Sequence, residues 1–286
     1  MPAPAPARTS PSRPTSTISM KPLDRRTVPY RIMLYAVEGF GKTTFGAFCP
    51  NPFIVMAGSE TGYDVLHDHG LVPSIPGARV STFSELLATL DSLATDRGDI
   101  ETVVIDSLST AESMLMDEVC EKHFGGDWGP QGFQSYGKGY GITETEWLKF
   151  VARLDRLWQR GCNVVMLAHT AVRSFTNPEG ADYKRYTPDL YDSERASVLR
   201  TTTQFADAVL FGNFLTVVDV SKEQKNKNVA EQRGKGTAGT TRVVRTERRD
   251  AWDAKNRYGM PDTIDIPNDP TQMAAAIWSH IKKEQA

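Results

Sequence analysis

The chain has 286 residues and a formal net charge of −2 at pH 7, so no overall positive field draws it to nucleic acid, and any such contact must come from local patches. Its three cysteines, Cys49, Cys120 and Cys162, show no paired spacing, which excludes a zinc ribbon and favours a reducing cytoplasm. No apolar run is long enough to span a bilayer, so no membrane contact is expected.

Two regions differ in composition. Residues 1–27 are expected to form a disordered tail, because the first twenty residues are rich in Pro, Ala, Ser and Thr and contain no acid. This stretch has no apolar segment typical of a secretory signal. Residues 28–286 have the length and apolar content of one α/β domain with a large core.

The run from Tyr30 to Thr44 consists of an apolar strand, a glycine-containing turn and the start of a helix. This order is typical of a P-loop, whose backbone N–H groups surround the phosphates of a nucleotide. Lys42 would reach the β- and γ-phosphates of ATP, and the Thr43 hydroxyl would bind Mg²⁺. Ala36 stands where the pattern has glycine, which is tolerable if its φ stays negative. The predicted nucleotide-binding residues are Val37, Glu38, Gly39, Phe40, Gly41, Lys42, Thr43 and Thr44.

Apolar strands and amphipathic helices alternate along the rest of the domain. Further strands are predicted at 53–57, 101–106, 163–168, 205–220 and 241–246. Capping boxes that begin at Thr82 and at Thr143 predict two helix starts, and helices are also predicted at 43–48, 108–123 and 271–283. This alternation predicts an α/β fold: a mostly parallel central sheet with helices on both faces, and a C-terminal β-hairpin.

Three polar residues follow strand ends, where an open parallel sheet binds its ligands. Asp106 ends an apolar strand in the Walker-B pattern and would hold Mg²⁺. Glu60 is the candidate base that polarises the attacking water, since Ser107, and not a glutamate, follows Asp106. His169 is the candidate sensor of the γ-phosphate, and with Lys42 and Glu60 it completes the predicted catalytic set. The alternatives are a solvated turn for Glu60 and a structural histidine at 169.

Taken together, the segments 36–44, 53–60, 103–109 and 164–170 resemble the RecA-like ATPase core, a P-loop NTPase fold. In that family a glutamate after the second strand is the base and a later polar residue senses nucleotide, as Glu60 and His169 would here. More narrowly, the chain is similar to short bacteriophage RecA-like proteins proposed to be single-strand annealing recombinases. This likeness rests on the segments 128–140, 168–170, 205–208 and 254–261.

The resemblance implies an ATPase that uses ATP and Mg²⁺, binds single-stranded DNA and assembles into a ring or filament. It also implies a location in the cytoplasm of a phage host and a single-strand-binding protein as a further partner. Lys255 and Arg257 would complete the ATP site of the next subunit, the alternative being surface cations in weak ion pairs.

Two segments are candidates for DNA contact. Aromatic rings interleaved with glycines between residues 124 and 141 could stack on single-stranded bases, or could fold back onto the core. The residues proposed there are Trp128, Phe133, Tyr136, Lys138 and Tyr140. The segment after His169 adds Arg173, Lys184 and Arg185, whose alternative is a solvated face.

The function favoured by the sequence is a DNA-stimulated ATPase that promotes annealing or strand exchange. One alternative is a nucleotide switch or helicase loader. The other is a P-loop small-molecule kinase, which would need an arginine-bearing lid that the sequence does not show.

Overall fold

The computed structural model describes residues 28–177, 180–219 and 235–281. The tail predicted at residues 1–27 lies outside this part of the chain. The described residues form a central nine-stranded sheet in the order β11-β9-β8-β1-β5-β4-β2-β3, with β10 paired to β8. The predicted α/β class is confirmed, and the arrangement is that of a P-loop NTPase core.

The middle of the sheet is parallel and the end beyond β8 is antiparallel. The parallel strands are β1 (Arg31–Ala36), β2 (Pro52–Ala57), β3 (Gly77–Val80), β4 (Thr102–Asp106), β5 (Asn163–Ala168) and β8 (Ala208–Asp219). The antiparallel strands are β9 (Lys235–Arg245), β10 (Lys255–Asn256) and β11 (Thr263–Ile266). The long β8–β9 pair confirms the predicted hairpin at the C-terminal end of the sheet.

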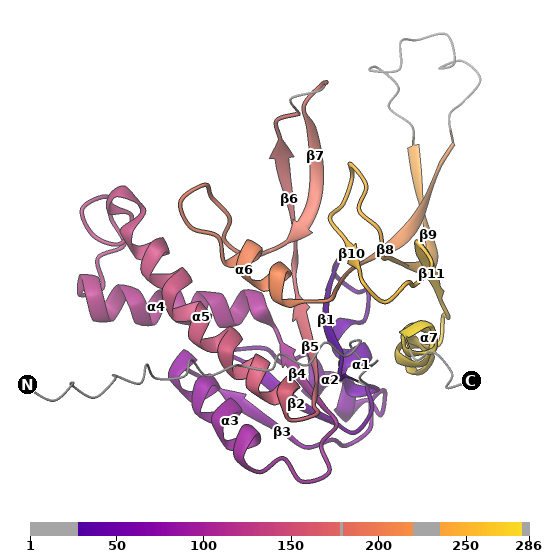
Figure 1. Ribbon diagram of the computed structural model, residues 1–286. Helices are drawn as coiled ribbons and strands as arrows, with labels where there is room; N and C mark the ends of the chain where they lie inside the picture. Colours follow the sequence, from indigo (N-terminus) through magenta and orange to yellow (C-terminus); the bar gives the residue numbers. More distant parts are fainter. Residues whose placement is uncertain (1–27, 178–179, 220–234, 282–286) are drawn as a thin grey trace, which may run out of the picture.

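Helices cover both faces of the sheet, because alternate residues of each strand point to opposite sides. Met33 and Tyr35 of β1 pack on one side with α3 (Phe83–Thr95), α4 (Leu108–Phe124), α5 (Lys138–Gln159) and α6 (Val198–Phe205). Ile32 and Leu34 pack on the other with α1 (Lys42–Ala47) and α7 (Met273–Ile281). Figure 1 shows these two layers on either side of the sheet. None of the described helices is long and apolar enough to cross a membrane.

The two predicted helix starts have different outcomes. The Thr82 side chain accepts a hydrogen bond from the backbone N–H of Glu85 at 3.1 Å, which confirms the start of α3. The start predicted at Thr143 is wrong, because α5 begins at Lys138 and the Thr143 hydroxyl donates within the helix to the Gly139 carbonyl. The glycines of this first turn suggested a loop, but Gly139 is needed there: a Cβ would lie 2.5 Å from the Phe133 ring.

A second, two-stranded sheet follows His169 directly and was not predicted. It consists of β6 (Thr170–Phe175) and β7 (Tyr183–Pro188), paired antiparallel. In Figure 1 this β6–β7 hairpin and the outer part of β8–β9 project from the central sheet in the same direction. The short helix α2 (Gly62–Asp68), which buries none of its residues, was also missed.

The alanine in the P-loop is accommodated by a glycine on the neighbouring strand. Ala36 pairs with Gly212 of β8, and a Cβ built at Gly212 would lie 2.8 Å from the Ala36 Cβ and 2.6 Å from the Phe40 ring. Ala36 is not among the residues with positive φ, as its tolerance required. Gly212 therefore provides the space that the methyl group of Ala36 and the buried ring of Phe40 occupy.

Substitution of Gly212 by alanine tests this packing. We expect Gly212→Ala to lower the free energy of unfolding by about 1–3 kcal/mol, because the added methyl overpacks a closed site. Adding Ala36→Gly should restore part of the loss. Gly141→Ala is the control, because a Cβ there would meet no atom within 4 Å and the φ of Gly141 is not positive. Chemical denaturation measures all four proteins; equal stability of Gly212→Ala and Gly141→Ala would refute the packing argument.

Candidate nucleotide-binding site

The parallel strands bring four sequence motifs to one edge of the sheet. The P-loop follows β1, Glu60 follows β2, Asp106 ends β4 and His169 follows β5. Because β5 lies between β1 and β4, its carboxyl end places His169 between the P-loop and Asp106. All the predicted catalytic residues therefore lie at the edge where an open α/β sheet binds its ligands.

The P-loop has the open backbone that phosphate binding requires. Gly39 and Gly41 have φ of 72° and 106°, values that favour glycine. A Cβ at Gly39 would meet no atom within 4 Å, so the loop has room above it. The Lys42 ammonium donates to the Ala36 carbonyl across the loop at 3.2 Å. Burial holds the pKa of Lys42 below its ordinary value, although the carboxylates of Asp106 and Glu60 oppose this shift.

Thr43 and Asp106 form the group that fits a magnesium ion. The Thr43 hydroxyl donates to Asp106 Oδ2 at 2.7 Å, and Asp106 is only 4% exposed. Burial raises the pKa of Asp106, and a divalent cation beside the carboxylate would act in the opposite direction. Mg²⁺ typically takes one or two protein oxygens and completes its shell with water and phosphate oxygens. A hydroxyl and a carboxylate beside a phosphate-binding loop match that donor set.

A glycine that sequence reasoning missed lies close to the Thr43–Asp106 pair. Gly62 begins α2, and a Cβ there would lie 3.1 Å from the Thr43 hydroxyl oxygen. Its position two residues after Glu60, the predicted base, could have marked Gly62 as a site residue.

Glu60 and His169 form an ion pair. Glu60 Oε1 accepts hydrogen bonds from His169 Nε2 at 3.2 Å, from Ser107 Oγ at 2.8 Å and from Thr110 Oγ1 at 2.7 Å. The bond from His169 is the main reason that the pKa of Glu60 falls to about 2. The same bond raises the pKa of His169. No described residue donates to Glu60 Oε2, which leaves that oxygen available to a water molecule.

Ser107 and Thr110 were not predicted as site residues. Ser107 is the N-cap of α4, and its hydroxyl accepts the Thr110 N–H at 3.3 Å while donating to Glu60. The absence of a glutamate after Asp106 pointed only to a base elsewhere. The Ser107 hydroxyl, in the place of that glutamate, and the Thr110 hydroxyl both donate to Glu60 and fix the orientation of its carboxylate.

The glycine-rich segment divides into exposed and buried rings. Tyr136 is 86% exposed and Trp128 42% exposed, and Lys138 is also exposed, so these three remain candidates for DNA contact. Phe133 is fully buried against Trp128 and Tyr140. Tyr140 lies with its ring parallel to that of Tyr191, 4.0 Å between centroids. The prediction that Phe133 and Tyr140 stack on bases is therefore corrected, because both pack within the chain.

The β6–β7 hairpin gives a similar division. Lys184 is exposed and Arg173 partly exposed, but Arg185 is 2% exposed. Its guanidinium pairs with Asp253 at 3.0 Å and lies 4.3 Å from the centroid of the Phe175 ring. The prediction that Arg185 contacts DNA is therefore corrected, since its charge is engaged inside the protein.

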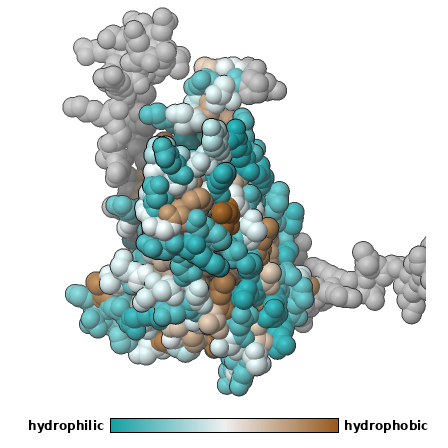
Figure 2. All heavy atoms as spheres, turned by 90° about the vertical axis from the view of Figure 1, so that its left-hand side faces the viewer, coloured by the Kyte–Doolittle hydropathy of each residue, from teal (hydrophilic) through white to brown (hydrophobic). Residues whose placement is uncertain are grey.

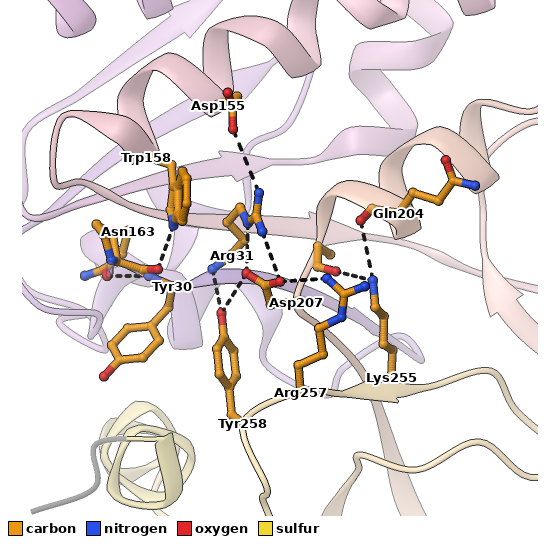
Figure 3. A network of polar contacts seen from close by, with 12 residues as sticks. Tyr30, Arg31, Asp155, Trp158, Asn163, Gln204, Asp207, Lys255, Arg257 and Tyr258 are labelled. Carbon is orange, nitrogen blue, oxygen red and sulfur yellow. Dashed lines mark hydrogen bonds and ion pairs between the residues drawn. The ribbon is translucent and has the colours of Figure 1, made fainter. Parts of the chain in front are cut away.

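Lys255 and Arg257 lie apart from the P-loop of their own chain, in the network of Figure 3. Lys255 pairs with Val209 of β8, whereas Ala36, at the start of the P-loop, pairs with Gly212 of the same strand. Three residues of β8, roughly 10 Å, separate Val209 from Gly212. Its ammonium donates to the Thr203 and Ala206 carbonyls at the end of α6, at 2.9 and 2.5 Å.

Arg257 pairs with Asp207 at 3.1 Å, and Arg31 binds the same carboxylate at 2.8 Å. These contacts give both Lys255 and Arg257 a role within the chain. Their proposed action on a neighbouring subunit stays a prediction.

Comparison with known families agrees with this geometry. A family model described as an AAA domain matches residues 28–258, which include the P-loop, Glu60, Asp106 and His169. No curated protein matches the chain.

The ion pair can be tested by titration of His169. By NMR we expect the pKa of His169 to lie above 6.5 in the wild type and to fall in Glu60→Gln, which cannot stabilise the imidazolium ion. Because the pKa is raised, the contribution of His169 to stability is present below pH 6.5 and is lost as the pH rises through its folded-state pKa. The contribution of Glu60 is present above pH 4.5 and is lost as the pH falls toward 2. Glu118→Gln, which does not touch the pair, is the control; an unchanged His169 pKa in Glu60→Gln would exclude the ion pair.

Proposed function

The chain belongs to the AAA domain family and is a nucleotide-binding ATPase, and on that premise we propose that it hydrolyses ATP with Mg²⁺ in response to single-stranded DNA and promotes annealing or strand exchange. The observation that carries the ATPase part is the convergence of Lys42, the Thr43–Asp106 pair and Glu60 at one sheet edge. The DNA part is supported by the exposed rings of Trp128 and Tyr136 and by the resemblance described above.

The side chains have distinct roles in the proposed hydrolysis. Lys42 and the loop N–H groups would bind the β- and γ-phosphates, and Thr43 and Asp106 would hold Mg²⁺, which would neutralise charge on these phosphates. Glu60 accepts a proton from water as the water oxygen bonds to the γ-phosphorus and the bond to the ADP oxygen breaks. ADP and phosphate leave.

His169 would set when Glu60 can act. With a pKa of about 2, Glu60 is a weak base while His169 donates to it. If the His169 N–H turns toward the γ-phosphate, Glu60 loses its main stabilising hydrogen bond and becomes more basic. A residue that pairs with the base and also contacts the γ-phosphate would thus make Glu60 an effective base only when ATP is bound.

The low pKa of Glu60 also supports a second candidate function, that of a nucleotide switch. A glutamate held at so low a pKa would suit a protein that binds ATP and turns it over very slowly. The substitution of Glu60 separates the two candidates, because only an ATPase with Glu60 as its base loses turnover.

We expect Glu60→Gln to reduce ATP turnover by about 10²–10⁴-fold, the usual contribution of a general base. Binding of ATP with Mg²⁺ should persist, because Lys42, Thr43 and Asp106 are unchanged. Phosphate release measures turnover and calorimetry measures binding. Asp68→Asn, an exposed position on α2, is the control. Turnover in Glu60→Gln equal to that of the wild type would remove Glu60 as the base, and it would favour the switch if both proteins bind ATP but release phosphate very slowly.

Binding to single-stranded DNA is tested through the exposed rings. Trp128→Ala and Tyr136→Ala should each weaken binding of a labelled oligonucleotide by about 1–3 kcal/mol, the usual value of a base stacked on an aromatic ring. Leu148→Ala, which truncates another exposed apolar side chain on α5, should bind as the wild type does. Wild-type affinity should also fall steeply with salt. Equal binding by all variants would contradict the stacking role.

A further inference from the structure

A short segment between β7 and α6, residues 189–197, connects the glycine-rich segment to the β6–β7 hairpin. We call it the bridge. On the hairpin side, the Asp189 N–H donates to the His169 carbonyl at 2.9 Å and the Arg173 guanidinium donates to the Leu190 carbonyl. Arg173 also lies 3.7 Å from the Asp192 carboxylate. The bridge is thus fixed to the base of the hairpin.

The bridge also contacts the glycine-rich segment at two points. The Tyr191 ring lies parallel to the Tyr140 ring, with 2° between their planes. The Arg195 guanidinium donates to the Tyr136 carbonyl at 3.1 Å. Tyr136 has φ of 49°, a left-handed conformation that a bulky residue rarely adopts, and its ring is 86% exposed. The hydrogen bond from Arg195 helps to hold this strained residue with its ring in solvent.

A buried carboxylate lies beneath the bridge. Glu112 of α4 is 7% exposed, and both of its oxygens accept the Tyr191 N–H, at 2.8 and 3.0 Å. Among the described residues it forms no ion pair, and burial raises the pKa of Glu112 to about 7. The Tyr191 N–H and, more weakly, the Arg173 guanidinium oppose this shift, but burial of the carboxylate outweighs them, and burying a charged group opposes folding. An apolar residue would pack there but would leave the Tyr191 N–H unpaired, so the acceptor serves to position the bridge.

We propose that Glu112, by binding the Tyr191 N–H, fixes the bridge so that the rings of Trp128 and Tyr136 and the β6–β7 hairpin form one continuous surface for single-stranded nucleic acid. Glu112 is thus a positioning residue, which acts through Tyr191 and contacts no ligand. Figure 2, which faces the side where α4 and α5 lie in Figure 1, shows a mainly hydrophilic surface with small hydrophobic patches. Such a surface suits alternating contacts to bases and phosphates. That the partner is single-stranded nucleic acid rests on the function proposed above. The contacts that join the bridge to the glycine-rich segment do not depend on that function.

Two matched pairs of variants test the proposal. Glu112→Ala removes the acceptor, whereas Glu112→Gln retains an oxygen for the Tyr191 N–H. Tyr191→Ala removes the stack on Tyr140 but keeps the N–H, whereas Tyr191→Phe keeps the stack. Hydrogen exchange of residues 125–137 reports on the link, and binding of a labelled oligothymidine reports on the surface. Glu118→Ala, on the same helix, is the control and should match the wild type in both measurements.

Both alanine variants should speed exchange in residues 125–137 and weaken oligothymidine binding by about tenfold or more, roughly the loss of one stacked base. The Gln and Phe variants should retain wild-type behaviour. In the Tyr136→Ala background, Glu112→Ala should add little, because it acts through that ring. Should Glu112→Ala fail to fold, Glu112→Asp, which shortens the side chain and withdraws the carboxylate from the Tyr191 N–H, tests the hydrogen bond, and the Tyr191 pair tests the ring stack.

Unchanged exchange in residues 125–137 in Glu112→Ala would overturn the role of Glu112, and unchanged exchange in Tyr191→Ala would overturn the link through the ring stack. Faster exchange with unchanged oligothymidine affinity would overturn the positioning role. If the wild type itself binds no oligothymidine, the proposed function and the nucleic-acid surface fail together, and the exchange data alone then decide whether the bridge links the two segments.

Discussion

The hydrogen bond from Thr43 to Asp106 is the contact on which the arrangement of the site depends. It joins residues that follow β1 and end β4, two strands separated by β5, so it forms only if all three strands end at the same level. The register meets this condition, because Tyr35 pairs with Ala168 and Asp106 with Leu167. Apolar residues that are fully buried on both faces fix that register, since a slip by one residue would move every side chain to the other face. The chemistry of the edge therefore rests on the packing of the sheet interior.

The charges at this edge are balanced in pairs. Lys42 faces the carboxylates of Asp106 and Glu60, and Glu60 in turn holds His169. Each of these groups has a pKa displaced from its ordinary value, and displaced pKa values tend to gather at functional sites. A bound triphosphate would bring several negative charges into this balance. The Glu60–His169 pair, held at 3.2 Å, is partly exposed, unlike the buried Asp106.

Local motifs predicted the parts of the site that lie within single strand ends. The P-loop, Glu60, Asp106 and His169 could each be located because an apolar strand precedes each one and parallel strands share an edge. Residues that act across distant segments gave no such signal: Ser107 and Thr110 reach Glu60 only in the fold, and Glu112 reaches Tyr191 only through the packing of α4. The burial of Phe133 and Arg185 was missed for the same reason, since their partners Tyr140 and Asp253 lie on other elements. The glycines before Thr143 obscured the start of α5, because the packing of Gly139 against Phe133 forms only in the fold.

The pairing of Ala36 with Gly212 bears on how such loops are recognised from sequence. A search that reads only the first strand and its turn would score the alanine as a defect in the phosphate-binding signature. In the fold, the glycine lies on the adjacent strand instead. Gly212 lacks the methyl group that Ala36 carries, so the two residues fit side by side. The space that the motif requires thus depends on two neighbouring strands. A P-loop sequence that lacks its first glycine can therefore still form a complete phosphate-binding loop.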